Sequence, residues 1–357
     1  SCLGPGGLRV GHEPQRAGYS GNTPEGSAAM DACFIQNQVL RAEFRAQGAE
    51  LRRLNVLGGP ELLWEGDPEV WGRTSPVLFP VVGRLTGNQT WVDGEAHALS
   101  QHGFARDLPF RLLRLTREDC VWQLVDSPET RERYPFPFDL RLAYRLEGPS
   151  LHVRYEVHNP GSRPLPASLG AHPAFRWPLA GLPRETHRIV FEQEEVAPVR
   201  RLRNGLLDGA PHPTPVEGNL LRLRDDHFRA DALILDRLRS RSLRYGAPGG
   251  PGVEIAWSGF PHLALWTIPG AGFLCIEPWH GHHSPEGFDG ELREKPGVFL
   301  VEPGRMRTFG WSVRVLPQFG VHVGGQHLAV RVHVDALPGG LGQQIREVEE
   351  IVAGDQD

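Results

Sequence analysis

Short segments in which hydrophobic and polar residues alternate recur along most of this chain. The clearest is LHVRYEVH, residues 151–158, where every second side chain is apolar. A period of two places the apolar side chains on one face of a β-strand and the polar ones on the other. Residues 309–315, FGWSVRV, have the same pattern. We therefore expect both segments to be half-buried strands.

Further apolar segments bounded by turn residues predict additional strands at residues 140–146, 187–192, 231–236, 252–257, 262–268, 272–277 and 297–302. Asp93-Gly94 separates TWV from EAHAL, and this dipeptide suits a tight type I′ turn, so we expect a hairpin there. No long helical pattern stands out between these segments. The pattern therefore predicts an all-β fold, an antiparallel sandwich with large sheets.

The two ends of the chain differ from this body. Residues 1–29 are rich in Gly, Pro and Ser with little apolar periodicity, and we expect a flexible leader. Residues 30–316 should form the single domain, and residues 317–357 an extension whose role the sequence does not indicate. This extension contains one alternating segment, residues 328–334. Near its end, apolar residues stand at a spacing typical of a helix: Ile345, Val348, Ile351 and Val352.

Composition and charge narrow the function classes. The 38 basic and 43 acidic residues are spread along the chain without a basic stripe, so nucleic acid is not an expected partner. No segment resembles a membrane span or the apolar core of a signal peptide. The four cysteines lie far apart without a CxxC pair, which favours a reduced, cytoplasmic setting: Cys2, Cys33, Cys120 and Cys275.

The stretch LCIEPWHGHHSPEG, residues 274–287, concentrates polar side chains after an apolar run. His280 and His282 would share one face of an extended segment, and HxH is a common spacing of metal ligands. The nearby Pro278 and Gly281 instead suggest a solvated loop. The residues alone leave both interpretations open.

Three other residues stand in contexts that suggest chemistry. Glu277 closes an apolar segment beside Trp279, and a partly desolvated carboxylate has a raised pKa that suits a general base. The alternative is a surface glutamate, because Glu302 in GVFLVEPG has nearly the same setting. His102 in LSQHGFARD and His172 in SLGAHPAFRWP lie near glycines, where backbone and ligand can approach closely, although lone histidines are more often structural.

Five blocks in this order resemble one known family: PVLFPVVGRLTGNQTWVDGEAHALSQHGFARD, NPGSRPLPASLGAHPAFRWPL, DALIL, GAGFLCIEPWHG and KPGVFLVEPGRMRTFGWSVRV. Together they resemble the aldose 1-epimerase (galactose mutarotase-like) family, in particular its compact bacterial branch, over about residues 34–316. The resemblance implies one β-supersandwich domain whose concave face binds a hexose. It also implies interconversion of the α and β anomers with no metal and no cofactor.

The resemblance further implies roles for individual residues. Glu277 in CIEPW matches the base that takes the proton from the C1 hydroxyl, and His172 in GAHPAF matches the acid that protonates the ring oxygen. His102 in QHGFARD matches a second histidine that orients the sugar. Arg84 in VGRL matches a sugar-binding arginine, and Asp231 at the start of DALIL matches a carboxylate that binds sugar hydroxyls.

The chain departs from the family pattern near these residues. Gly83 stands where the better-known galactose mutarotases carry Asn, and Trp279 stands where they carry Gln. Relatives in the compact branch commonly have an acidic residue in place of His282-His283. These departures leave the identity of the sugar open. An aromatic side chain, Trp279 or Trp177, could stack on the apolar face of a pyranose or pack in the core.

Three other functions stay open. A hexose-6-phosphate 1-epimerase would need arginines at the edge of the pocket, and Arg73, Arg106 and Arg176 are the candidates. The same fold could serve a non-catalytic carbohydrate-binding or regulatory protein. A metal-dependent enzyme would use His280 and His282. In the favoured hypothesis the only expected partner is a small sugar, and the sequence does not indicate the oligomeric state.

Overall fold

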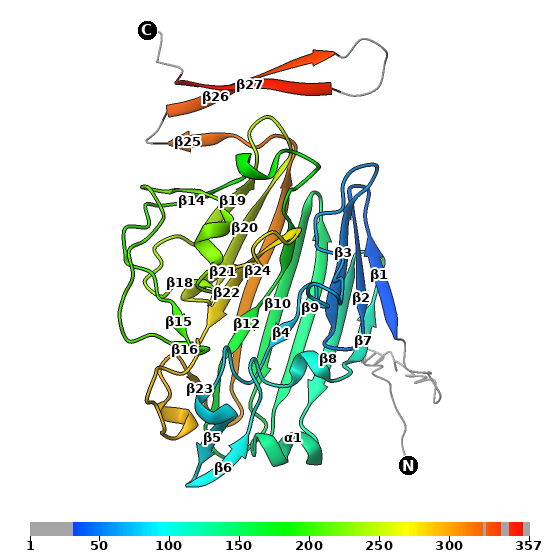
Figure 1. Cartoon of the computed structure of the whole chain (residues 1–357). Helices are drawn as coiled ribbons and strands as arrows, with labels where there is room; N and C mark the ends of the chain where they lie inside the picture. The colour runs from blue at the N-terminus through cyan, green and yellow to red at the C-terminus, as the bar shows by residue number, and fades with distance from the viewer. Residues whose placement is uncertain (1–30, 324–325, 337–342, 353–357) are drawn as a thin grey trace, which may run out of the picture. The chain divides into compact units, whose positions relative to one another are not determined.

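The structure, a computed structural model, describes residues 31–323, 326–336 and 343–352, with side chains up to residue 320 (Figure 1). Antiparallel strands form nearly all of its regular structure, and these ranges contain one α-helix, the short α1 (Pro128–Arg133). In the same ranges no helix has the length and apolar character needed to cross a membrane. The predicted all-β fold with antiparallel sheets is therefore confirmed.

The largest sheet has nine strands in the order β17-β14-β19-β20-β24-β10-β9-β8-β7. At its centre, β10 (Ser150–His158) pairs along its whole length with β9 (Asp139–Glu147) and β24 (Met306–Leu316). The alternating residues of β10 are buried and more exposed in turn, as predicted. The remaining strands are β7 (Arg111–Leu115), β8 (Asp119–Val125), β14 (Arg188–Phe191), β17 (Leu220–Arg222), β19 (Ser242–Gly246) and β20 (Gly252–Ser258).

A second sheet has six strands and contains the stretch rich in histidine. Its order is β18 (Leu233–Leu235), β21 (His262–Trp266), β22 (Phe273–His280), β12 (Leu169–Ala171) and β4 (Val77–Leu78), with β13 (Ala174–Arg176) also paired to β22. β22 does not end at Glu277 as predicted but continues through Pro278 to His280. Pro278 lies where the neighbour on one side of β22 changes from β13 to β12, and such a break tolerates a residue without an N–H group.

Smaller sheets and turns complete the body of the chain. β5 (Gln89–Val92) and β6 (Glu95–Ala98) form the predicted hairpin, and Asp93 and Gly94 have φ of 53° and 79°, as a type I′ turn requires. The other strands are β1 (Ala32–Gln36), β2 (Leu40–Arg45), β3 (Glu50–Val56), β11 (Leu165–Ala167), β15 (Leu202–Arg203), β16 (Leu206–Leu207) and β23 (Phe299–Val301). The 3-10 turns are η1 (Thr86–Asn88), η2 (Ala105–Asp107), η3 (Arg184–Thr186), η4 (Asp225–Phe228) and η5 (Leu292–Glu294).

The C-terminal extension forms a sheet of β25 (Val321–Val323), β26 (Gln326–Ala336) and β27 (Gln343–Val352). The alternating segment at residues 328–334 lies in β26, as predicted. The expected helix around Ile345–Val352 is wrong, because these residues form β27, antiparallel to β26. Valine and isoleucine favour strands, and β26 supplies the backbone partners that a strand needs. The predicted leader, residues 1–29, lies outside the described residues, and the division of the chain into leader, domain and extension stays a prediction.

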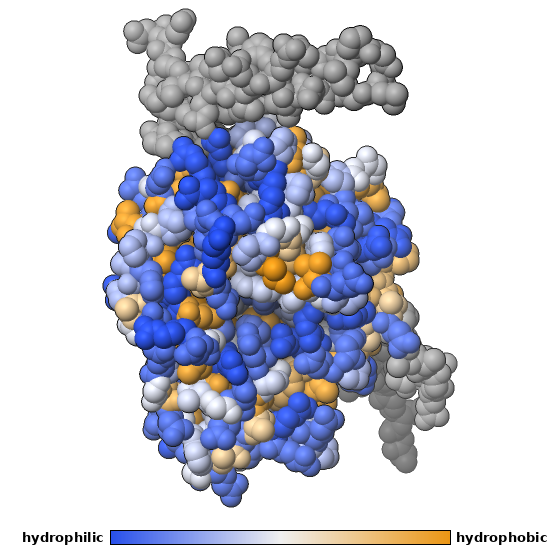
Figure 2. Space-filling model, viewed as in Figure 1, coloured by the Kyte–Doolittle hydropathy of each residue, from blue (hydrophilic) through white to orange (hydrophobic). Residues whose placement is uncertain are grey.

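The hydrophobic core lies between the two large sheets. Leu274 and Ile276 of β22 share one buried cluster with Leu142 of β9, Val153 of β10 and Val313 of β24. On the face shown in Figure 2, apolar residues form small groups among hydrophilic ones. The side of β22 that carries Leu274 and Ile276 therefore packs in the core, and its other side can line a cavity.

Candidate active site

The alternation of side chains along β22 builds one wall of a cavity. Leu274 and Ile276 face the main core, whereas Phe273 and Cys275 belong to a separate apolar cluster on the other side of the strand. By the same period of two, Glu277 follows Phe273 and Cys275 onto that side. The cavity has a volume of about 350 Å³, within the range of small-molecule sites. Its lining residues are Trp71, Arg73, Gln101, His102, Arg106, His172, Leu202, Asp231, Ala232, Trp266, Glu277, Trp279 and His283.

Glu277 and His172 contact each other directly in this cavity. His172 Nε2 lies 3.1 Å from Glu277 Oε2, and both side chains are buried. His172 stands between β12 and β13, which both pair with β22, so backbone pairing brings the two residues together. The contact is not aligned as a hydrogen bond, and both Glu277 Oε2 and His172 Nδ1 lack a hydrogen-bond partner. Buried polar atoms of this kind are available to a ligand.

Burial sets the protonation of this pair. Desolvation raises the pKa of Glu277 well above its ordinary value, and it lowers the pKa of His172 to about 3. Trp71 stacks on the His172 ring at a centroid distance of 5.1 Å, and Trp266 approaches it edge-on at 5.9 Å. Both shifts favour the neutral forms, a protonated carboxyl on Glu277 and an uncharged imidazole on His172.

His102 faces the same pair from another segment. Its Nδ1 accepts a hydrogen bond from the N–H of Gly83 at 3.0 Å, so Nε2 carries the ring hydrogen when the imidazole is neutral. Nε2 lies 3.3 Å from the side chain of Gln101. Burial lowers the pKa of His102 well below its ordinary value, and its ring lies 5.7 Å from that of His172. His102 is thus a neutral group with a donor at the cavity.

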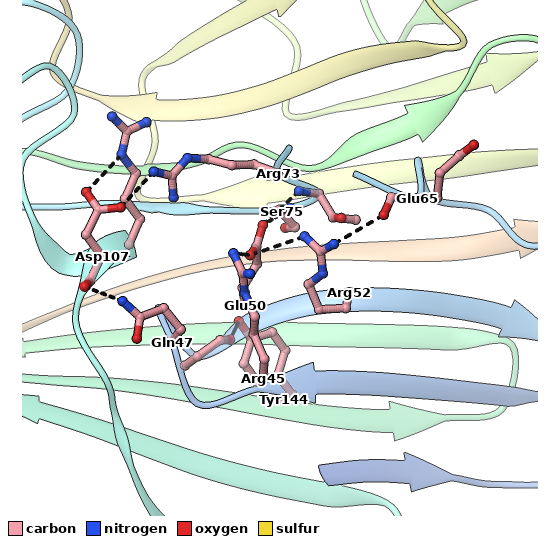
Figure 3. A network of polar contacts seen from close by, with 12 residues as sticks. Arg45, Gln47, Glu50, Arg52, Glu65, Arg73, Ser75, Asp107 and Tyr144 are labelled. Atoms are coloured by element: carbon pink, nitrogen blue, oxygen red, sulfur yellow. Dashed lines mark hydrogen bonds and ion pairs between the residues drawn. The ribbon is translucent and has the colours of Figure 1, made fainter. Parts of the chain in front are cut away.

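Two arginines line another part of the cavity. Arg73 Nη2 donates to Asp107 at 2.7 Å, and Arg106 lies 3.8 Å from the same carboxylate (Figure 3). Burial lowers the pKa of Arg106 to about 10, which leaves it charged at neutral pH. Two guanidinium groups share one carboxylate, so this part of the cavity has an excess of positive charge. Arg176 is not among the lining residues and pairs instead with Glu65 at 3.1 Å.

A buried carboxylate holds the segment that carries Arg73. Glu50 Oε1 accepts hydrogen bonds from the backbone N–H groups of Thr74 and Ser75 at 2.7 and 3.1 Å (Figure 3). Its other oxygen forms ion pairs with Arg45 and Arg52. The Glu50 side chain is only 2% exposed, and these contacts compensate for the free-energy cost of removing its charge from water. Glu50 thereby fixes the backbone directly after Arg73.

Two of the three predicted sugar-binding residues line the cavity, and the third does not. Asp231 and Trp279 line the cavity, with Asp231 in a left-handed conformation at φ 67°. Arg84 is exposed, is not among the lining residues, and donates from Nε to Asn88 at 3.2 Å. Trp177 lies in the core and donates to the carbonyl of residue 184. The roles of Arg84 and of the other predicted residues stay predictions, but Arg84 and Trp177 do not contact the cavity.

Sequence reasoning missed several lining residues. Trp266 could have been found, because the alternation in HLALW places it opposite Leu263 and Leu265, which lie in the core. Trp71 stands in a loop without periodicity, so no pattern there pointed to it. Arg73 and Arg106 were named only for a phosphorylated substrate, since residues 33 positions apart give no sequence signal of proximity.

One group of side chains could offer ligands to a metal ion. Donor atoms of His172, Cys275 and Glu277 lie within 4.8 Å of one another. Burial raises the pKa of the Cys275 thiol well above its ordinary value, which opposes the thiolate form that binds metals. In the described part of the chain, His280 and His282 belong to no such group, and their Nδ1 atoms contact the carbonyls of residues 259 and 283.

Comparison with known proteins agrees with this architecture. The family model described as aldose 1-epimerase matches residues 31–296. The plasmid-encoded protein LacX of Lactococcus lactis is 31% identical over 295 residues, covering 79% of this chain and 98% of LacX. A galactose mutarotase related enzyme of Lactobacillus acidophilus has a TM-score of 0.75 at 30% identity, over 82% of this chain and all of that one. A galactose mutarotase-like protein of Lactobacillus casei also has a TM-score of 0.75, at 27% identity, over 80% of this chain and all of that one.

The substitution Glu50→Gln tests whether the buried carboxylate holds the arginine segment. The amide keeps the volume but removes the charge facing Arg45 and Arg52, so we expect the free energy of unfolding to fall by about 2–4 kcal/mol. Chemical denaturation measures this value. The matched control is Glu43→Gln, because Glu43 is partly exposed and pairs with Arg41 at the surface, where the loss should stay below about 1 kcal/mol. Equal losses in both variants would contradict the assigned role.

Proposed function

Because the chain belongs to the aldose 1-epimerase family, we propose that it interconverts the α and β anomers of a hexose. The observation that carries this proposal is the contact between the buried Glu277 and His172 in a cavity of monosaccharide scale. Anomer exchange needs one group that takes a proton from the C1 hydroxyl and one that gives a proton to the ring oxygen. A carboxyl and an imidazole that share one proton can supply both.

In the proposed reaction Glu277 and His172 together accept one proton from the sugar and donate one to it. With the shared proton on His172, the Glu277 carboxylate removes the hydrogen of the C1 hydroxyl. The bond between C1 and the ring oxygen breaks, its electron pair goes to the ring oxygen, and His172 protonates that oxygen. Rotation about C1–C2 then exposes the other face of the carbonyl. Glu277, now protonated, and neutral His172 have the protonation that closes the ring as the other anomer, so one pair serves both directions.

Other lining residues would position the sugar. The Nε2–H of His102 can donate to an oxygen near the reacting bond, and the carboxylate of Asp231 can accept from ring hydroxyls. The indole rings of Trp71, Trp266 and Trp279 give the cavity apolar walls, and a pyranose presents apolar C–H faces to such rings. A site with these walls excludes water, which strengthens the electrostatic effect of each polar group.

Replacing either member of the pair should abolish most catalysis. We expect Glu277→Gln and His172→Asn each to lower kcat by about 10²–10⁴-fold, because each removes a proton-transfer partner. Polarimetry of freshly dissolved α-D-glucose and α-D-galactose measures the rate. His280→Gln is the control, since His280 is not among the lining residues. If wild-type protein bound these sugars without accelerating anomer exchange, the non-catalytic binding function would replace the enzymatic one.

The two arginines favour a second candidate, a hexose-6-phosphate 1-epimerase. Arg73 and Arg106 line the cavity and share a single carboxylate, Asp107. Guanidinium groups bind phosphate oxygens through charge-assisted hydrogen bonds. A phosphate on C6 of the substrate would compensate for the excess positive charge, whereas a neutral hexose would leave it uncompensated.

Comparison of glucose with glucose 6-phosphate tests the phosphorylated substrate. We expect wild-type kcat/KM to be higher for the phosphate, and Arg106→Gln to lower it by about 10- to 100-fold for the phosphate only, the range expected for lost hydrogen bonds to a charged group. Arg176→Gln is the matched control, because Arg176 pairs with Glu65 away from the cavity lining. Equal rates on both substrates would contradict this candidate and leave the free hexose.

We propose a cytoplasmic setting for this activity, with the sugar as the partner. Three cysteines in the described residues, Cys33, Cys120 and Cys275, are free thiols. Free thiols fit a reducing compartment.

A further inference from the structure

His283 lies in the cavity wall, and the proposed proton transfers do not use it. The residue follows the end of β22 and is 3% exposed. Its ring lies 6.0 Å from those of His102 and Trp279, measured between centroids. Of the three histidines in the stretch HGHH, it is the one among the lining residues. A buried polar ring that borders the cavity is available to bind a ligand.

Gly83 makes room for this ring. A Cβ atom at position 83 would lie 2.4 Å from His283 Cδ2 and Cγ and 2.6 Å from its Cα. Gly83 also has φ of 76°, which other residues rarely adopt. Any side chain at position 83 would therefore displace the imidazole. The glycine and the histidine depend on each other, and together they determine the shape of this wall.

Backbone groups hold the ring by one nitrogen. The carbonyl of Gly205 and the N–H of Arg84 approach His283 Nδ1 at 2.8 and 3.1 Å. Nε2 has no hydrogen-bond partner among the described residues, and it keeps some exposed surface. It is therefore accessible from the cavity. Whichever tautomer is present, Nε2 can pair with a hydroxyl group, because a hydroxyl both donates and accepts.

The segment that carries His283 is fixed on two sides. Lys295, the single lysine of the chain, is buried and donates from Nζ to the carbonyl of His282. Ser284 donates its N–H to the carbonyl of Arg84 at 2.9 Å. Burial lowers the pKa of His283 to about 4, so the ring is neutral at physiological pH. The cavity thus presents a preorganised, uncharged hydrogen-bonding group at this position.

The arrangement of the lining residues indicates which part of a sugar would meet this ring. Arg73 stands two residues after Trp71, whose ring stacks on His172, whereas the His283 ring lies 6.0 Å from that of Trp279, the next residue on the Glu277 face of β22. The ring oxygen, and with it C5 and C6, would therefore lie toward the arginines. C1 would lie at Glu277, and C2 and C3, on the other side of C1, toward Asp231 and His283.

We propose that His283 is a sugar-binding residue that hydrogen-bonds the C2 or C3 hydroxyl through Nε2 and so determines which sugars the site accepts. This deepens the proposed function and rests on it for the orientation of the sugar. Asp231, on the same side of the cavity, would accept a hydrogen bond from the neighbouring hydroxyl. The Gly83–His283 pair then acts as a specificity element that is separate from the proton-transfer pair.

The substitution His283→Phe tests the proposal, because it keeps a flat ring and removes both nitrogens. The ligands are glucose, 2-deoxyglucose and 3-deoxyglucose, or their 6-phosphates if wild type prefers these. Their binding is followed by the fluorescence of the cavity tryptophans. We expect wild type to bind at least one deoxy sugar about 10-fold more weakly than the parent, which is the loss expected for one hydrogen bond. The variant should bind the parent about 10-fold more weakly and lose that difference.

Two further variants keep the test interpretable. His280→Phe, outside the cavity lining, should retain the wild-type discrimination. His283→Gln, whose amide can still reach a hydroxyl, should recover part of it even if the phenylalanine variant folds poorly. The proposal is overturned if His283→Phe keeps the wild-type ratios for both deoxy sugars, or if wild type binds none of these ligands. If the binding pattern holds but wild type accelerates no anomer exchange, the enzymatic function fails and the role of His283 in binding stands.

Discussion

The burial of the Glu277 carboxyl group against His172 is the constraint on which the rest of this site depends. An isolated carboxylate in such an environment would cost several kcal/mol, so the group must be protonated or paired. The structure provides both options with one proton, since Nε2 of His172 lies 3.1 Å away. β22 is paired with β12 and β13 on either side of His172, so the contact is a consequence of sheet register. A pair in which either member can hold the one proton is suited to moving a proton in either direction.

The groups around this pair divide the cavity into parts with different electrostatic character. Arg73 and Arg106 make one part positive. Arg73 pairs with Asp107, the neighbour of Arg106 in the chain, and Glu50 of β3 binds the backbone directly after Arg73. Asp231 and the neutral His283 make another part polar, with a carboxylate in the lining. The same tryptophan rings that exclude water from the pair also bring an apolar surface to the sugar. In the proposed function, substrate choice and proton transfer therefore rest on different residues.

Much of the fold could be predicted from the sequence, because strand periodicity is a local property. The alternation in β10 and β24 is sufficient, whereas Pro278 hides the true end of β22, because a proline inside a strand resembles a strand end in sequence. The spacing in β27 fitted a helix until the partner strand β26 was known. In the site, Glu277, His172, His102, Asp231 and Trp279 were named in advance and line one cavity. Arg84 was named but faces Asn88, and the contribution of Arg73 required knowledge of a long-range contact that no local pattern encodes.

The most direct test of a buried, protonated Glu277 is the free energy of unfolding of wild type and Glu277→Gln between pH 5 and 8. Because the folded pKa is raised, stability from the protonated group is present below the unfolded value of about 4.3 and is lost as pH rises. The neutral glutamine does not have this dependence. As long as Glu277 is protonated, His172 faces an uncharged partner in both proteins, so its contribution cancels. Wild type should therefore lose up to about 1.4 kcal/mol per pH unit relative to the variant until Glu277 ionises. A difference between the two proteins that is independent of pH, or that favours wild type at high pH, would contradict the account.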